Sequence, residues 1–238
     1  GGGYAQYVAA PEAMVMPIPA GLDFAEAASL PEAYATCYLI LFREGQFQPG
    51  ETLFFPAGAS GLASVGIPMA KAFGAYVITS VLTADLCARI AHLGADRIVD
   101  LSRENTADVI RAEAEAGHPV DVAIDCLAGE TIGQCFPYVN EGCPWVLIST
   151  LAGVTTTVPL RALLTKGIIF KGSMLRKRSV AEKGALLEEL VQKVWPKLES
   201  GAIRPTIYRV LPIECVQEAH AILERGENVG KVVLQVRP

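Results

Sequence analysis

A few small residues in one short stretch could bind the phosphates of a nucleotide. Residues 54–80 read "FFPAGASGLASVGIPMAKAFGAYVITS": an apolar strand, a turn of small residues, a helix-length segment and a second apolar strand. In such a turn glycines allow a tight bend and close approach of the backbone to a pyrophosphate, and the following helix offers free N–H groups and its dipole. Gly58 and Gly61 supply the bend, Ser60 a hydroxyl, and Leu62 leads into the helix. This pattern predicts a dinucleotide-binding turn.

Two residues depart from the usual form of that turn. Ala63 stands where we expect the third glycine, which allows a slightly looser packing of helix on strand. Pro68 falls about two turns into the helix, where it removes one backbone hydrogen bond and should kink the helix. This kink would lie at a distance from the phosphates, so it affects the packing of the helix more than phosphate binding. Taken alone the turn is a weak signal, and a glycine-rich turn that binds something else is the alternative.

The elements around the turn strengthen the interpretation. Strand-like and helix-like segments alternate from residue 50 on, and the strands are nearly uniformly apolar, which indicates a parallel sheet covered on both faces. We predict strands at 52–56, 75–80, 96–100, 120–126, 144–149 and 167–173, with helices at 61–73, 84–94, 105–117 and 130–140. Gly74, Gly94 and Gly117 should end helices in a left-handed conformation. The fold class is α/β, a doubly wound parallel sheet (Rossmann) over about residues 29–175.

The two ends of the chain do not follow this alternation. Residues 4–10 read as one alternating strand, followed by a proline-punctuated connection. Residues 179–198 predict a long amphipathic helix, and a strand, a helix and a closing strand follow at 206–213, 214–226 and 231–236. The opening and closing strands have no complete sheet in this chain, so we expect them to be two edges of a second domain.

Composition and charge exclude several classes of protein. The net charge is −5 and the only basic triplet is "RKR" at 176–178, which argues against nucleic acid as a partner. No apolar run approaches the ~18 residues of a membrane span, and no secretory signal is recognisable. The six cysteines have no CxxC spacing and sit among apolar neighbours, so we expect no metal site, reduced thiols and a cytoplasmic location.

Longer motifs carry a family resemblance. "LPEAYATCY", "PAGASGLASVGIPMAKAFGA", "VDVAIDCLAGE", "GSMLRKR" and "ENVGKVVL" are similar to the zinc-free branch of the medium-chain dehydrogenase/reductases, the quinone oxidoreductase branch and in particular its p53-inducible group. The similarity runs from Gly1 to Pro238. It implies remnants of a GroES-like catalytic domain at both chain ends, with its N-terminal part at 1–28, a dinucleotide-binding Rossmann domain at 29–175 and a C-terminal return at 176–238. Most of the catalytic domain would then lie outside a truncated chain.

The resemblance also implies positions for a cofactor. Pyrophosphate would lie at the glycine turn, the nicotinamide and its ribose at the ends of the fourth to sixth strands, and the adenosine at the end of the second strand. The implied cofactor-binding residues are Thr36, Gly58, Ser60, Gly61, Leu62, Ser80, Thr83, Cys126, Leu127, Ser149, Leu151, Leu175, Arg176 and Asn228. Their alternative role is simple packing at strand ends.

Several positions differ from the family pattern. NADPH-using relatives place a glycine, a serine and a lysine after the second strand; here Leu82 and Thr83 replace the first two, and Asp85 and Leu86 stand where the lysine belongs. No acidic residue ends the strand at Val81 to clamp an NAD ribose. The implied cofactor is therefore NADPH, with NADH not excluded.

After the third predicted strand, Leu101 replaces a tyrosine that in NADPH-using relatives usually helps to bind the 2′-phosphate. Ala128 and Ser149 replace glycines near the nicotinamide, and their side chains narrow the space for the nicotinamide ring. At the position of a cysteine ligand in zinc-dependent relatives the chain has Glu32.

The implied activity is an NAD(P)H-dependent oxidoreductase that transfers hydride to quinones or α,β-unsaturated carbonyls. An enoyl-thioester reductase and a non-catalytic dinucleotide-binding or interaction module are the alternatives. The family's catalytic polar residues lie outside this chain, so no catalytic residue is assigned. Residues 167–175 form an apolar edge strand that predicts a homodimer; a helix at 181–198 folded over that edge would instead leave a monomer.

Overall fold

The larger of two sheets in the protein has six parallel strands. This computed structural model describes residues 2–237. The strands are β1 (Thr52–Phe55), β2 (Tyr76–Val81), β3 (Arg97–Asp100), β4 (Val122–Asp125), β5 (Pro144–Leu147) and β6 (Ile169–Gly172). They lie in the order β3-β2-β1-β4-β5-β6, and every neighbouring pair is parallel. This is the strand order of the Rossmann fold, so the predicted fold class is confirmed.

Helices cover both faces of this sheet, and the strand side chains alternate between them. Leu53 and Phe55 pack on one face, under α3 (Ala63–Ala72) and α4 (Ala84–Ile90), which η3 (Ala91–Leu93) extends. Phe54 packs on the other, under α5 (Thr106–Glu115), α6 (Thr131–Cys135) and η4 (Phe136–Tyr138). Burial on both faces explains why the central strands β1 and β4 are almost wholly apolar. Short α7 (Leu160–Lys166), which the sequence did not predict, precedes β6.

Local signals at helix ends behave as expected. Gly74, Gly94 and Gly117 have φ of +88°, +85° and +96°, so all three predicted left-handed residues are confirmed. Pro68 lies inside α3, which continues unbroken through it.

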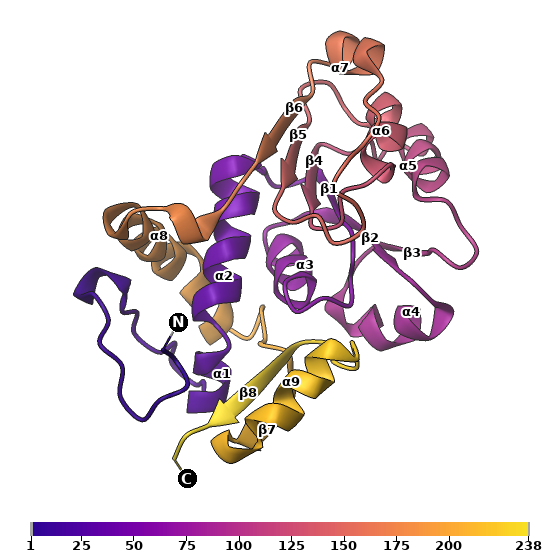
Figure 1. Ribbon diagram of the computed structural model, residues 1–238. Helices are drawn as coiled ribbons and strands as arrows, with labels where there is room; N and C mark the ends of the chain where they lie inside the picture. The colour runs from indigo at the N-terminus through magenta and orange to yellow at the C-terminus, as the bar shows by residue number, and fades with distance from the viewer. Residues whose placement is uncertain (1, 238) are drawn as a thin grey trace.

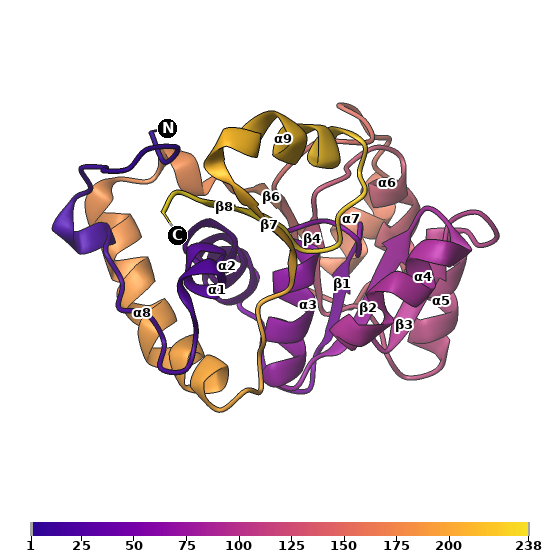
Figure 2. The same cartoon turned by 90° about the horizontal axis from the view of Figure 1, so that it is seen from below.

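A helical segment that the sequence did not predict lies between the six-stranded sheet with its helices and the long helix near the C-terminus. It comprises α1 (Phe24–Ala28), α2 (Pro31–Tyr38) and the π-helical η2 (Leu39–Glu44). Figures 1 and 2 show α2 between α3 and the long helix α8 (Val180–Glu199), which matches the predicted helix 179–198. Ser179 and Glu182 form a capping box at the start of α8.

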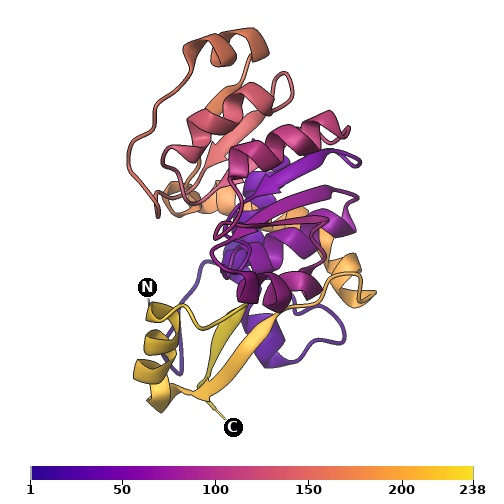
Figure 3. The ribbon, with the colours of Figure 1, turned by 90° about the vertical axis from the view of Figure 1, so that its right-hand side faces the viewer.

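The C-terminal residues form a small second sheet. β7 (Ile207–Pro212) and β8 (Lys231–Gln235) pair in parallel, connected by α9 (Val216–Glu224), with η6 (Ile213–Cys215) at its start. Figure 3 shows this unit, in yellow, set off from the six-stranded sheet. The predicted segments at 206–213, 214–226 and 231–236 are confirmed, and the closing strand has a partner in β7.

The predicted strand at 4–10 is wrong. Residues 4–6 form a bend and 7–10 have no regular structure, since no strand lies beside them to pair with their backbone groups. η1 (Glu12–Met14) follows. The Tyr4 hydroxyl lies 3.1 Å from Nε2 of His220 on α9. Within residues 2–237, no helix combines the length and the apolar character needed to cross a membrane.

Candidate cofactor site

The glycine turn lies where β1 ends, pressed against β2. The Gly58 N–H donates to the Ser80 carbonyl at 2.8 Å. A β-carbon on Gly58 would lie 2.6 Å from Oγ1 of Thr79 and 2.7 Å from Cδ1 of Ile90, so only glycine fits at this point of the turn. Ser80 is buried, and its Oγ lies 3.5 Å from the N–H of Ala57.

Free backbone donors gather at the start of α3. The Ser60 hydroxyl accepts a hydrogen bond from the N–H of Ala63 at 3.1 Å, which satisfies one donor of the first turn. In the part of the chain that the structure describes, the N–H groups of Gly61 and Leu62 donate to no protein atom. A β-carbon on Gly61 would meet nothing closer than 3.8 Å. The turn therefore combines free N–H groups with a helix dipole, which together suit an anion.

A further glycine of α3, Gly66, lies close against β1. A β-carbon on Gly66 would lie 2.4 Å from Cε2 of Phe55, so its absence permits the close packing of α3 on β1. Ala63, which stands where we expected the third glycine, begins α3 and is fully buried, so small residues occupy both 63 and 66 on the packed side of the helix.

The ends of β4 and β5 bring four of the predicted residues together. Cys126 follows β4, and its thiol lies 3.9 Å from the Pro56 carbonyl beside the glycine turn. The N–H of Leu151 donates to the Cys126 carbonyl at 3.2 Å, and the N–H of Ala152 to the Leu127 carbonyl at 2.8 Å. Ser149 lies in the same connection. Burial, with a smaller contribution from Asp125, raises the pKa of the Cys126 thiol to about 11, so it is a neutral group at physiological pH.

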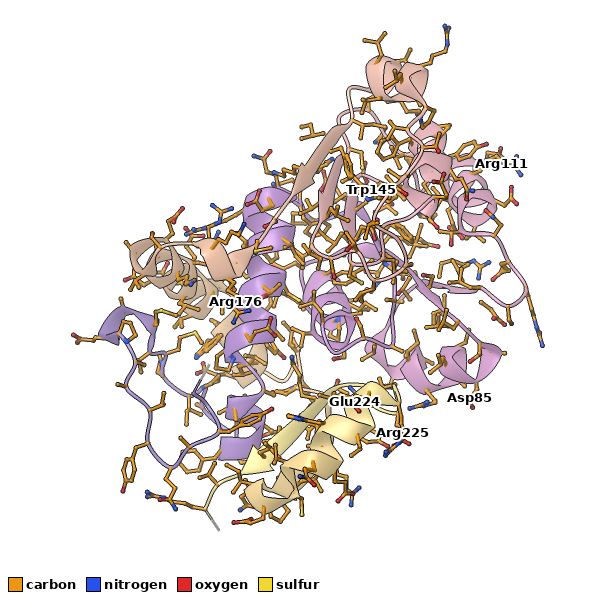
Figure 4. The ribbon with its side chains drawn as sticks, in the orientation of Figure 1. Asp85, Arg111, Trp145, Arg176, Glu224 and Arg225 are labelled. Atoms are coloured by element: carbon orange, nitrogen blue, oxygen red, sulfur yellow. The ribbon has the colours of Figure 1, made fainter. Side chains whose placement is uncertain are left out.

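A buried carboxylate that the sequence analysis missed supports this loop. Asp125 is 3% exposed, and its Oδ1 accepts the N–H groups of Leu127 and Ala128 at 2.8 and 2.9 Å. Its Oδ2 accepts Nε1–H of Trp145 at 3.0 Å, and Figure 4 shows Trp145 among the strands of the large sheet. Ala128 has φ of +59°. The signal in the sequence was an aspartate that ends an apolar strand just before small residues.

The turn between α9 and β8 closes over the glycine turn. The Asn228 amide donates to the Gly230 carbonyl at 2.8 Å, and this carbonyl and Cδ of Lys231 both lie 3.8 Å from the β-carbon position of Gly61. Arg89 on α4 donates to the Glu227 carbonyl, which ties the same turn to the far side of the site. The structure thus brings Asn228 close to the glycine turn.

Glu32 connects this turn to α2. Its Oε2 lies 3.4 Å from Nζ of Lys231, and its Oε1 accepts a hydrogen bond from the Thr36 hydroxyl at 3.1 Å. Thr36 therefore lies near the other predicted residues, although it comes from a helix that the sequence did not predict.

The remaining predicted residues lie at opposite ends of the site. Leu175 and Arg176 belong to η5 (Leu175–Lys177) after β6, and Thr83 precedes α4 without capping it through its side chain. Figure 4 places Arg176 beside α2, well separated from Asp85 on α4. An extended ligand with two distinct ends would be needed to contact both groups.

No zinc site is formed by the residues that the structure describes. Nowhere in 2–237 do three His, Cys, Asp or Glu side chains approach one another closely enough to hold a metal ion. The Glu32 carboxylate is engaged by Lys231 and Thr36 instead.

Comparison with known proteins identifies the family. The family model described as zinc-binding dehydrogenase matches residues 93–234, more than half of the chain. The chain belongs to this family, as the resemblance implied.

Individual relatives agree with this assignment. All of the chain aligns at 30% identity with 65% of a quinone oxidoreductase-like protein 2 homolog of Nematostella vectensis, and at 32% identity with 53% of a 2-methylene-furan-3-one reductase of Solanum lycopersicum. The quinone oxidoreductase of Thermus thermophilus, solved alone and with NADPH, superposes with a TM-score of 0.82 at 26% identity, over 99% of this chain and 74% of that one. The chain thus spans less than two thirds of these two curated relatives.

Proposed function

We propose that the protein binds a nicotinamide dinucleotide and belongs to an oxidoreductase that transfers hydride from NAD(P)H to quinones or α,β-unsaturated carbonyls. One observation carries the proposal: the glycine turn with its free N–H groups lies at the end of β1, between β2 and β4, where the strand order reverses. Ligands of open α/β sheets bind at this switch point. The quinone oxidoreductase-like and enone-reductase relatives support the activity.

The residues present fit such a cofactor. The N–H groups of Gly61 and Leu62, with the ammonium of Lys231, would hold the pyrophosphate. The remaining predicted residues divide between the two ends: Thr36, Cys126, Leu127, Ser149, Leu151, Leu175 and Arg176 at the nicotinamide, and Ser80 and Thr83 at the adenosine. Asn228 would shape the turn that covers Gly61.

Hydride transfer is the chemistry that the bound dinucleotide would supply. The contribution of this chain would be positional. The loop that Asp125 fixes would set Leu127 and the thiol of Cys126 beside the nicotinamide, and this neutral thiol would add no charge there. No residue of this chain is assigned to binding the acceptor.

The preference between the two cofactors should be slight. Asp85 is exposed after the end of β2, where its charge would oppose a 2′-phosphate, and the guanidinium of the nearby Arg89 already bonds the Glu227 carbonyl. We propose NADPH as the cofactor, with NADH accepted. The six free cysteines support a reducing, cytoplasmic location.

We further propose that two copies of the chain pair along β6. This strand is an edge of the sheet, and Ile169 and Phe170 on it are 53% and 41% exposed. Leu160 and Leu164 on neighbouring α7 are exposed as well. An unprotected apolar edge of this kind favours pairing with an identical edge.

Calorimetric titration with NADPH and NADH tests the proposal. We expect binding by the wild-type chain and none by Gly61→Asp, whose carboxylate would occupy the pyrophosphate position. Gly3→Asp is the matched control, since it adds the same charge at an exposed glycine with open space around it. Absent binding by wild type, or equal binding by wild type and Gly61→Asp, would contradict the proposal.

Assays of the whole protein with a quinone, an enone and an enoyl thioester separate the candidate activities. Turnover of the first two supports the proposed class, and turnover of the thioester alone supports an enoyl reductase. Dinucleotide binding without turnover of any acceptor supports a non-catalytic module.

A further inference from the structure

One carboxylate holds two residues of the proposed site. Glu32 accepts the Thr36 hydroxyl with Oε1 at 3.1 Å and pairs with Nζ of Lys231 through Oε2 at 3.4 Å. We propose that Glu32 sets the dinucleotide affinity: it competes with the pyrophosphate for the ammonium of Lys231, and binding transfers that ammonium from carboxylate to phosphate. This inference rests on the proposed function.

The position of Lys231 makes it the cation that an anion at the glycine turn would attract. Its Cδ lies 3.8 Å from the β-carbon position of Gly61, so its side chain passes directly over the turn. The backbone that carries it is closely constrained, because Gly230 has φ of +95° and a β-carbon there would lie 2.4 Å from the Thr206 carbonyl oxygen. Only the flexible end of the Lys231 side chain is left to move.

The Glu32 carboxylate is well placed to give up this partner. Glu32 is 75% exposed at its side chain, whereas Lys231 is 28% exposed. A carboxylate in water loses little when its cation leaves, because solvent replaces the interaction. A pyrophosphate at Gly61 carries more negative charge and has backbone donors beside it, so it would be the stronger partner for Lys231.

A second consequence concerns Thr36. Its hydroxyl is tied to the same carboxylate, so a shift of Lys231 leaves Thr36 as the one side-chain partner that Glu32 keeps among the contacts of the described residues. Glu32 would thereby hold Thr36 in place at the nicotinamide end while the ammonium of Lys231 moves from the Glu32 carboxylate to the pyrophosphate. Glu32 is thus a positioning residue rather than a catalytic one.

The experiment is a titration of the full chain with NADPH at low and high salt. We expect Glu32→Gln to bind about two- to fivefold more tightly at low salt, as expected for removal of one exposed competing charge, and to lose this gain at high salt. Glu188→Gln is the control, because it removes an equal charge from an exposed position on α8. Lys231→Gln should bind more weakly.

The double variant Glu32→Gln with Lys231→Gln distinguishes competition for the ammonium from a general effect of removing one negative charge. We expect Glu32→Gln to tighten binding in the wild-type background and not in the Lys231→Gln background, since the competition needs the ammonium. An equal gain in both backgrounds, or unchanged or weaker binding by Glu32→Gln, would overturn the inference while the proposed function stands. No NADPH binding by wild type would overturn both. Glu32→Ala serves as a second variant if thermal melting shows Glu32→Gln to be poorly folded.

Discussion

Gly66 on α3 and Phe55 on β1 pack so closely that no other residue fits at position 66 without movement. A β-carbon on Gly66 would lie 2.4 Å from Cε2 and 3.0 Å from Cζ of the Phe55 ring, and Phe55 is completely buried. This contact sets the distance of α3 from the sheet. It therefore fixes how close the start of the helix, with the free N–H groups of Gly61 and Leu62, comes to the end of β1.

Gly66→Ala should lower the free energy of unfolding by about 1–3 kcal/mol, because overpacking moves the helix or the ring. Urea unfolding followed by circular dichroism measures the change. Gly61→Ala is the matched control, since its β-carbon has 3.8 Å of room, and it should change stability by less than about 0.5 kcal/mol. Partial recovery of Gly66→Ala by Phe55→Leu would identify the ring as the cause; equal stability of the two alanine variants would refute it.

The large sheet could be predicted from sequence because each of its strands is a short apolar run between helices with recognisable ends. Residues 24–44 escaped prediction for a physical reason. Ala33, Tyr34, Cys37 and Tyr38 are all buried in α2, which is covered on several sides by α3 and α8. With only Pro31 and Glu32 exposed at its start, α2 lacks the clear apolar stripe of period 3.6 on which the prediction depends.

Only those parts of the site whose residues are close together in the sequence could be predicted. Gly58, Ser60, Gly61 and Leu62 form one continuous turn, so spacing alone indicated it. The contact between Glu32 and Lys231 joins residues 199 positions apart, and no local pattern carries such information. The strand expected at 4–10 failed for the related reason that alternation predicts a strand but cannot supply its neighbour.

The bond between Trp145 and Asp125 should be important for stability. Trp145→Phe removes the donor and leaves Oδ2 of a buried carboxylate without a partner, which should cost about 1–3 kcal/mol or more of unfolding free energy. Trp195→Phe is the comparison: it also deletes an indole donor, at 2.8 Å from the Pro17 carbonyl, but Pro17 is exposed and water can replace the bond. Denaturant unfolding should show the larger loss for Trp145→Phe. A larger loss for Trp195→Phe would contradict the role given to Asp125.

Cofactor choice should depend on the charge at position 85. We expect wild type to discriminate between NADPH and NADH by less than about tenfold, since one phosphate ion pair is worth about 1–3 kcal/mol and is missing here. Asp85→Lys, at a side chain that is 80% exposed, should raise the ratio severalfold by attracting the 2′-phosphate. Parallel titrations with both cofactors measure it. A hundredfold NADPH preference of wild type would mean that Asp85 lies outside the pocket.

Acid should destabilise the protein partly through Glu104. The hydrogen bond from Arg97 is the largest influence on this carboxyl, and it holds the pKa of Glu104 below its ordinary value of 4.5. A carboxyl with a lowered folded-state pKa stabilises the fold above the unfolded pKa, and this contribution is lost as pH falls below about 4.5 through the folded value. Glu104→Gln should therefore be less stable at pH 7 and lose less stability on acidification. Thermal melting at pH 7, 5 and 3 tests this, with Glu188→Gln as control; parallel curves for wild type and Glu104→Gln would disprove the assignment.

Assembly through β6 gives the last prediction. Ile169 is 53% exposed on an edge strand whose outer backbone groups face no other strand within residues 2–237. The alternative cover, helix α8, packs against α2 and η1 instead. We expect the chain to be a dimer at tens of micromolar, and Ile169→Lys to make it monomeric, because the variant places two like charges near the twofold axis without a partner. Light scattering coupled to size exclusion measures the mass of each. Val180→Lys, which alters a half-exposed apolar residue at the start of α8, is the control and should remain dimeric. A monomeric wild-type chain, or a dimer that survives Ile169→Lys unchanged, would show that β6 is not the interface.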